Sequence, residues 1–291
     1  MHLGNGAITT ECALIGWGLT AIGMVAGTRL SRTAAAPSAG KVAALGALVF
    51  AAQMINLPVG AHSSAHLVGG VLLAKMLGPA LGMRVMMLVL AVQALLLGDG
   101  GSLALGVNCW NMAILPALLV AGVERWGKMN GWTTGLAAAA SVLLAALCIP
   151  LEVAVGRTSL ELVSWQSFFV AMLGFHLFAA ILEGVVTIGI LAAWNAATAK
   201  SPVLAMRCTS LLAFSLAGVA WGISSNLPDG YEAAAERTMQ QLLIEGQPLL
   251  TQVAFSSEAV VAIVATSVFV ISSFTMARLH REAKTSLVAQ S

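Results

Sequence analysis

The chain has 291 residues, of which 59% are hydrophobic and only 9% charged, and its mean hydropathy is +0.92. A soluble domain carries about 25% charged residues, so these side chains cannot cover a water-facing surface. The long Leu, Ala and Val runs exclude the alternating polarity of a membrane β-barrel. The sequence therefore predicts an all-α, polytopic helical bundle in a membrane. The net charge of +2 is too small to indicate a nucleic-acid partner.

About nine transmembrane helices are expected, since each needs about 20 apolar residues. They fall at about residues 12–28, 42–55, 67–77, 85–97, 103–123, 134–149, 165–194, 211–223 and 253–276. Pro58 and Pro79 end the second and third spans, because proline cannot continue helical pairing. Short spans such as the third are candidates for re-entrant segments.

The distribution of positive charge orients these spans. The first 28 residues contain Glu11 and no Lys or Arg, which argues against a cleavable signal peptide and places the N-terminus outside. All of the 14 Lys and Arg residues except Arg157 and Arg237 then fall on the cytoplasmic side, as the positive-inside rule requires. The same parity places Met1-His2, residues 62–66, Asp99 and the loop 224–252 outside.

The first two residues, Met1-His2, carry three nitrogens that can chelate one ion. The terminal amine and the His2 amide close one ring, and the amide and the His2 imidazole close a second. One position of a square plane is left for a nitrogen from elsewhere, and such sites suit Ni(II), Cu(II) and, less strictly, Co(II). The alternative is a frayed terminus with an accidental histidine.

Two further histidines lie where a helix breaks at membrane depth. Non-helical backbone is tolerated there only when it lines a cavity or packs in protein, so His66 is a candidate metal ligand. The alternative is a histidine that only bonds a carbonyl between helices. His62 lies four residues earlier and is a possible ligand or a residue at the entrance. No glutamate forms an HExxH pattern with them, which argues against a metalloprotease.

Four polar residues are candidates for groups that hold a ligating imidazole in orientation, as metal sites usually require. They are Ser64, Asp99, Asn108 and Asn111. The two asparagines are spaced to share a helical face. Hydrogen bonding between helices explains them equally well.

His176 and Glu183 lie two helical turns apart and are predicted on one side of the seventh span. A carboxylate facing lipid is costly, so Glu183 must face a partner group or a cavity. A proton relay, a contact to another subunit, a structural ion pair and a protonated acid inside the bundle all remain open.

No nucleotide-binding or thiolate motif accompanies these groups. The sequence has neither GxxxxGK[ST] nor GxGxxG in a βα context, so any ATP hydrolysis belongs to another chain. Cys12, Cys109, Cys148 and Cys208 form no CxxC pair, and they signal neither a disulfide framework nor a thiolate metal site. The sequence predicts no enzymatic activity.

Several ordered motifs resemble the CbiM/NikM family, the substrate-capture components of energy-coupling factor transporters for cobalt and nickel. They are MHLGNG at 1–6, NLPV at 56–59, SSAHLVGG at 63–70, LGP at 77–79, QALLLGDGG at 93–101, ALGVN at 104–108, NMA at 111–113 and EG at 183–184. The resemblance covers about residues 1–200. Residues 201–291 look like a fused part of the CbiN/NikN type, with two spans around the outer loop 224–252.

The resemblance implies a metal site formed by the Met1 amine, the His2 amide and imidazole, and the His66 imidazole. The transported substrate is then Ni²⁺ or Co²⁺. Implied partners are a CbiQ/NikQ-like transmembrane coupling subunit and CbiO/NikO-like cytoplasmic ATPases, in the bacterial cytoplasmic (inner) membrane. Cobalamin biosynthesis is an implied use of imported cobalt.

Two other functions remain to be weighed. A metal-conducting channel would need no ATPase partner. A membrane electron carrier would bind haem through axial histidines such as His66 and His176, although the predicted spans place these two residues at different depths.

Overall fold

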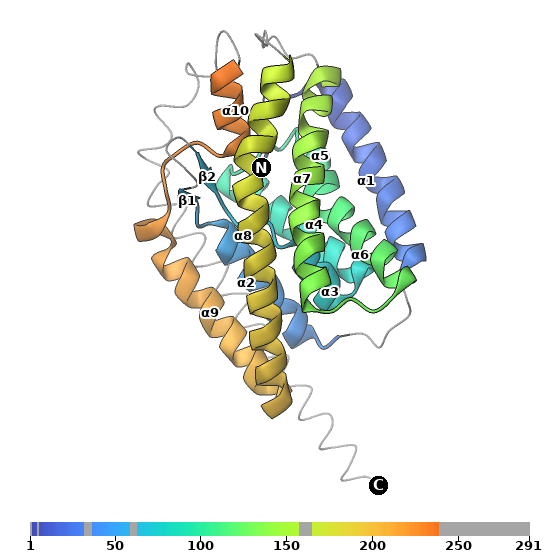
Figure 1. The fold of residues 1–291 in the computed structure, drawn as a ribbon, viewed down its shortest axis with the longest axis vertical. Helices are drawn as coiled ribbons and strands as arrows, with labels where there is room; N and C mark the ends of the chain where they lie inside the picture. The colour runs from blue at the N-terminus through green and yellow to red at the C-terminus, as the bar shows by residue number, and fades with distance from the viewer. Residues whose placement is uncertain (1, 5, 32–36, 59–62, 157–164, 239–291) are drawn as a thin grey trace.

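The structure is a computed structural model, and it describes residues 2–4, 6–31, 37–58, 63–156 and 165–238. It is a bundle of helices with one short hairpin (Figure 1). The helices are α1 Thr10–Leu30, α2 Ala39–Gln53, α3 Gly70–Leu77, α4 Pro79–Val92, α5 Leu105–Cys109, α6 Leu115–Trp126, α7 Gly131–Gly156, α8 Trp165–Lys200, α9 Pro202–Ile223 and α10 Gly230–Thr238. The π-helical segments η1 Gln93–Leu97 and η2 Trp110–Ile114 extend α4 and join α5 to α6. The predicted all-α membrane bundle is confirmed.

Six helical stretches within the described residues are long and apolar enough to cross a membrane. They are 10–30, 79–97, 105–126, 131–155, 165–200 and 202–220. The helix α2, with 15 residues, is shorter, and α3 has only 8 residues. At 1.5 Å per residue α3 is about 12 Å long, less than half of the ~30 Å hydrocarbon core. The ninth expected span, 253–276, lies outside the described residues.

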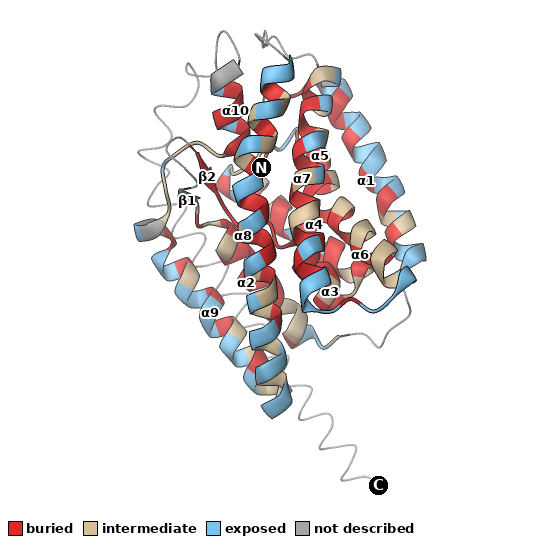
Figure 2. Ribbon diagram, in the orientation of Figure 1, coloured by how far each residue is buried: buried red, intermediate tan, exposed pale blue. Residues whose placement is uncertain are grey.

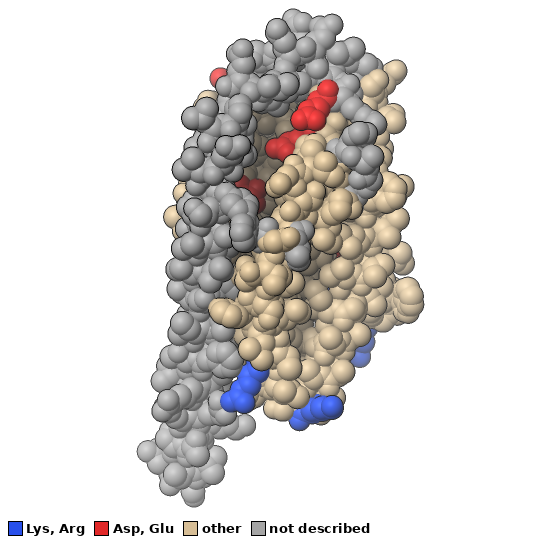
Figure 3. All heavy atoms as spheres, turned by 90° about the vertical axis from the view of Figure 1, so that its left-hand side faces the viewer, with Lys and Arg blue, Asp and Glu red and all other residues tan. Residues whose placement is uncertain are grey.

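The two ends of the bundle differ in charge. The helices α1, α3, α6 and α8 each carry a basic residue in the last turn, respectively Arg29, Lys75, Arg125 and Lys200. Lys and Arg gather at one end of the face drawn in Figure 3, and acidic residues lie toward the other. This separation agrees with the orientation that the positive-inside rule predicts. We call these the basic end and the acidic end.

Apolar side chains cover much of the outside of the bundle. Figure 2 shows buried faces turned inward and exposed faces along the outer sides of α1, α8 and α9. Leu14, Ile22, Val185 and Leu211 are all more than half exposed on these helices. A soluble protein rarely exposes so large an apolar surface to water, so these faces contact lipid.

The described residues between α2 and α3, 54–58 and 63–69, are not helical. Residues Leu57–Pro58 form strand β1, which pairs antiparallel with Ser64–Ala65 of β2. After β2 the backbone runs without regular structure to Gly69, which adopts a left-handed conformation (φ 77°) before α3 begins. A Cβ at Gly69 would lie 2.7 Å from a Val49 methyl carbon, so only glycine fits here. We call residues 66–69 the His66 segment.

Candidate metal centre

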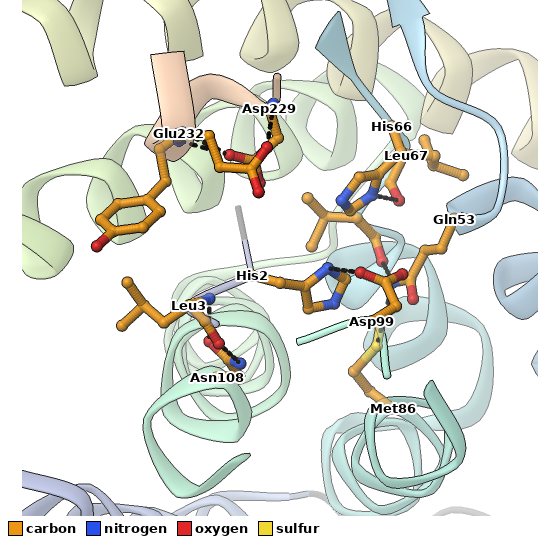
Figure 4. Close-up of polar contacts among 12 residues, drawn as sticks. His2, Leu3, Gln53, His66, Leu67, Met86, Asp99, Asn108, Asp229 and Glu232 are labelled. Carbon is orange, nitrogen blue, oxygen red and sulfur yellow. Dashed lines mark hydrogen bonds and ion pairs between the residues drawn. The ribbon is translucent and has the colours of Figure 1, made fainter. Parts of the chain in front are cut away.

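Residues 2–4 lie inside the bundle toward its acidic end, and Leu3 is completely buried. The Leu3 N–H donates to Asn108 Oδ1 at 2.9 Å, and Asn108 Nδ2 donates to the Leu3 carbonyl at 3.0 Å. The Gly101 N–H donates to the same carbonyl at 2.8 Å. Figure 4 shows Leu3 and Asn108 beside each other below His2. Asn108 therefore fixes the backbone next to His2 and does not bond an imidazole directly.

The rings of His2 and His66 are stacked. Their centroids are 5.1 Å apart and their planes differ by 18°. Both residues are buried, each with 8% of its surface exposed. Asp99 places its Oδ1 3.5 Å from His2 Nδ1 (Figure 4). The structure thus brings together His2, His66 and Asp99, three of the residues singled out in the sequence.

Burial keeps both imidazoles neutral. It lowers the pKa of His2 to about 3 and that of His66 to about 4, because a charged ring loses its hydration inside the protein. The Nδ1 of His66 lies 3.0 Å from the Leu67 carbonyl oxygen, which selects the tautomer with the proton on Nδ1. The lone pair of His66 is then on Nε2. Neutral imidazole is the form that binds transition metals.

The turn that follows η1 passes directly against His2. Gly100 has φ 82°, and a Cβ there would lie 3.4 Å from His2 Cδ2 and 3.3 Å from Asn108 Nδ2. Gly98, two residues earlier, also has positive φ, but a Cβ there would meet nothing within 4 Å. The sequence run Gly98-Asp99-Gly100 therefore supplies both a carboxylate and a close backbone approach to His2.

Residues 224–230 lie against the β1–β2 hairpin. Ser64 donates through its N–H to the Pro228 carbonyl at 2.8 Å and through its hydroxyl to the Leu227 carbonyl at 2.7 Å. Asp229 Oδ1 accepts from the N–H groups of Tyr231 and Glu232 at 2.8 and 2.9 Å, which caps α10. Ser64 thus joins the hairpin to the chain after α9, an attachment that its position in the sequence did not indicate.

A small cavity adjoins the back of His66. Its volume is about 10 Å³, and its walls include His66, His176 and Gly230. His176 Nδ1 lies 2.8 Å from the Met172 carbonyl oxygen. The expectation that His66 and His176 lie at different depths was wrong, because both side chains line this one cavity. The cavity has room for about one water molecule, far less than a haem needs.

The His66 segment is also bonded to two long helices. Glu183 of α8 accepts from the Val68 N–H at 2.7 Å and from the Gly69 N–H at 2.8 Å. Gln53 at the end of α2 donates to the Val68 carbonyl at 2.6 Å. Sequence reasoning found Glu183 without its partner and missed Gln53, which ends a largely apolar helix.

Asn111 lies elsewhere. Its Nδ2 donates to Glu152 Oε2 of α7 at 2.9 Å, whereas Asn108 bonds Leu3. The shared helical face expected for the two asparagines is interrupted, because the π-helical segment η2 begins at Trp110. Asn111 therefore makes the bond between helices that was its alternative interpretation.

Two predicted site residues, Met1 and His62, lie outside the described residues. Within the described part of the chain, no group of three or more His, Cys, Asp or Glu side chains is placed to hold an ion. A ligand set built on backbone nitrogen and a terminal amine, as the sequence predicts, would not appear in such a group.

The fold and the two stacked histidines define a multi-pass membrane protein with a buried, nitrogen-rich centre toward its acidic end. Residues 2–201 match the family model CbiM, described as the cobalt uptake substrate-specific transmembrane region. The chain belongs to this family.

Relatives and solved structures agree with that assignment. A protein of Haloquadratum walsbyi named for metal transport is 34% identical over 196 residues, which are 65% of this chain and 88% of the relative. The fused nickel transport protein NikMN of Rhodobacter capsulatus is 31% identical over 128 residues, 44% of this chain and 37% of that protein. The crystal structure of a truncated transition metal transporter superposes with a TM-score of 0.56 at 26% identity, and covers 66% of this chain and 97% of that one.

Proposed function

We propose that this protein captures Ni²⁺ or Co²⁺ from the outer side of the bacterial cytoplasmic membrane for an ATP-driven importer. The ion would be held by the Met1 amine, the His2 amide and imidazole, and the His66 imidazole. The relative in Rhodobacter capsulatus carries the name of a nickel transporter, and one in Ruminiclostridium cellulolyticum that of a cobalt transporter. These names support nickel or cobalt as the proposed substrate.

The stacking of His2 on His66 is the observation that supports this site most strongly. The two rings come from distant parts of the chain, yet they lie 5.1 Å apart and buried. Both are neutral at pH 7, so no proton must leave an imidazole before an ion binds. Nitrogen donors of this kind favour Ni(II) and Co(II) over the hard cations Mg²⁺ and Ca²⁺.

Capture would occur by closure of the N-terminal residues around the ion. The terminal amine and the His2 amide lose protons as the ion binds, and the chelate replaces its water ligands. Asn108 keeps Leu3, and therefore the His2 amide, in a fixed place through two hydrogen bonds. Release to the cytoplasm requires a second conformation with lower affinity, which a transmembrane coupling subunit and cytoplasmic ATPases would stabilise.

The direct test is equilibrium binding of Ni²⁺ and Co²⁺ to the purified full chain. The comparison is between the native chain and a variant with one alanine added before Met1. The added residue moves the amine out of the chelate, so we expect the tight binding to be lost while the thermal stability without metal stays the same. Equal affinity of the two proteins would refute the terminal site.

The channel is the competing function. An isolated chain that conducts ions would let Ni²⁺ enter liposomes without ATPase partners, whereas a capture subunit would bind the ion and give no flux. An absorption spectrum of the purified protein tests the remaining alternative, because bound haem gives a Soret band.

A further inference from the structure

The His66 segment lies level with the middle of α8 although it has no regular secondary structure. Its backbone groups therefore need partners that a helix would have supplied, since lipid offers none. Glu183 accepts the N–H groups of Val68 and Gly69 at 2.7 and 2.8 Å, one on each carboxylate oxygen. Gln53 satisfies the Val68 carbonyl from the opposite side of the segment.

The geometry of this contact favours a carboxyl group over an amide. Both side-chain oxygens accept an N–H group, whereas an amide offers only one acceptor oxygen. The two N–H groups also immediately precede α3, which starts at Gly70. A helix N-terminus carries partial positive charge, so a buried anion is favourable at this point.

The position of Glu183 depends on how closely α8 packs against α7, and Gly135 of α7 and Gly184 of α8 allow this close packing. A Cβ on Gly135 of α7 would lie 2.6 Å from side-chain carbons of Ile188 and 2.9 Å from the Gly184 carbonyl oxygen, both on α8. The two helices therefore touch through their backbones directly beside Glu183. A methyl group at position 135 would push α8 away and withdraw the carboxylate from the His66 segment.

We propose that Glu183 is the positioning residue of the metal site: its carboxylate holds Val68 and Gly69 and thereby keeps His66 opposite His2. This inference rests on the proposed function. Glu183 does not touch the ion. It holds the backbone two and three residues after His66, immediately before α3 begins.

The test compares Glu183→Gln and Glu183→Ala with Glu152→Gln in the purified full chain. Glu152 is a matched control, because it is another carboxylate within the bundle that accepts one hydrogen bond, from Asn111. Three quantities are measured: the Ni²⁺ dissociation constant, the visible absorption band of planar Ni(II), and the melting temperature without metal.

Glutamine can accept only one of the two N–H groups, so we expect the Glu183→Gln dissociation constant to rise about tenfold and the alanine variant's about a hundredfold. The absorption band should weaken or shift in both. Glu152→Gln should melt earlier than the native chain, yet keep its dissociation constant within about twofold and its band unchanged.

Unchanged binding and an unchanged band in the Glu183 variants would overturn the inference, as would an equal loss of binding in Glu152→Gln. Where the Glu183 variants do not fold, Gly135→Ala decides the question, because it leaves the carboxylate in place and should still weaken binding; native affinity there counts against the inference. A native chain without the planar band overturns the proposed function itself. If an added N-terminal residue abolishes binding but the Glu183 variants bind normally, the proposed metal site stands and only the positioning role of Glu183 is overturned.

Discussion

The imidazole of His2 lies parallel to that of His66, with the ring centroids 5.1 Å apart. Residues 2–4 thus pack against the non-helical segment that precedes α3. Asn108 holds the first partner through the Leu3 backbone, and Glu183 holds the second through Val68 and Gly69. Each histidine is therefore placed by a polar residue of a different helix, and each placement can be tested separately.

Replacing His66 by alanine should weaken Ni²⁺ binding by about a hundredfold or more, since loss of a ligand costs more than the 10–100-fold typical of supporting residues. The ring is buried, so the melting temperature without metal is measured alongside the dissociation constant. His280→Ala is the control, because that histidine lies in the predicted cytoplasmic tail. Equal affinity of the His66 variant and the native chain would remove His66 from the site.

Asn108→Ala should weaken binding about 10–100-fold, because the Leu3 backbone loses both hydrogen bonds that fix it beside His2. Asn111→Ala provides a close comparison. It removes a partly buried bond to Glu152 and should lower the melting temperature, but it leaves residues 2–4 in place. Binding lost to the same extent in both variants would mean that Asn108 acts on the fold and not on the site.

The sequence was a good guide to the helices and to the presence of polar groups. Its low charge and apolar runs predicted the membrane bundle, and the position of Pro58 predicted the break before His66. Local patterns of this kind are properties of neighbouring residues. The helix bounds differ most at the ends, for example at α9, which begins at Pro202 and not at about residue 211, because a helix can continue past its apolar stretch into polar residues such as Arg207.

The partners of the polar groups were not predictable in the same way. Nothing near Gln53 or Glu183 in the chain indicates that both bond the backbone at Val68. These contacts depend on how α2 and α8 pack against a non-helical segment. The interior requires that each buried polar group find a partner, but that rule does not say which one.

Gly100→Ala should weaken metal binding several-fold, and Gly98→Ala should not. Both residues have positive φ, so either substitution costs about 1–2 kcal/mol of backbone strain and should lower the melting temperature to a similar extent. Only the methyl group at position 100 would contact the site, 3.3 Å from Asn108 Nδ2 and 3.4 Å from His2 Cδ2. A loss of affinity shared by both variants would show that strain in the turn, and not contact with His2, is responsible.

Metal binding should release protons in a number that identifies the ligands. The imidazoles of His2 and His66, with pKa values lowered by burial to about 3 and about 4, become protonated only as the pH falls toward those values. They therefore release none above pH 5. A terminal amine has an ordinary pKa of about 7.7–8.0, and an amide ligand always loses its proton.

We accordingly expect about two protons per ion at pH 6.5 and about one at pH 8.5, with affinity rising as the pH rises between them. Calorimetric titration of Ni²⁺ in buffers of different ionisation enthalpy counts these protons. One proton at both pH values would remove the Met1 amine from the ligand set but keep the His2 amide. If no proton is released at either pH, both the Met1 amine and the His2 amide are excluded as ligands. The ion would then have to be held by side chains alone.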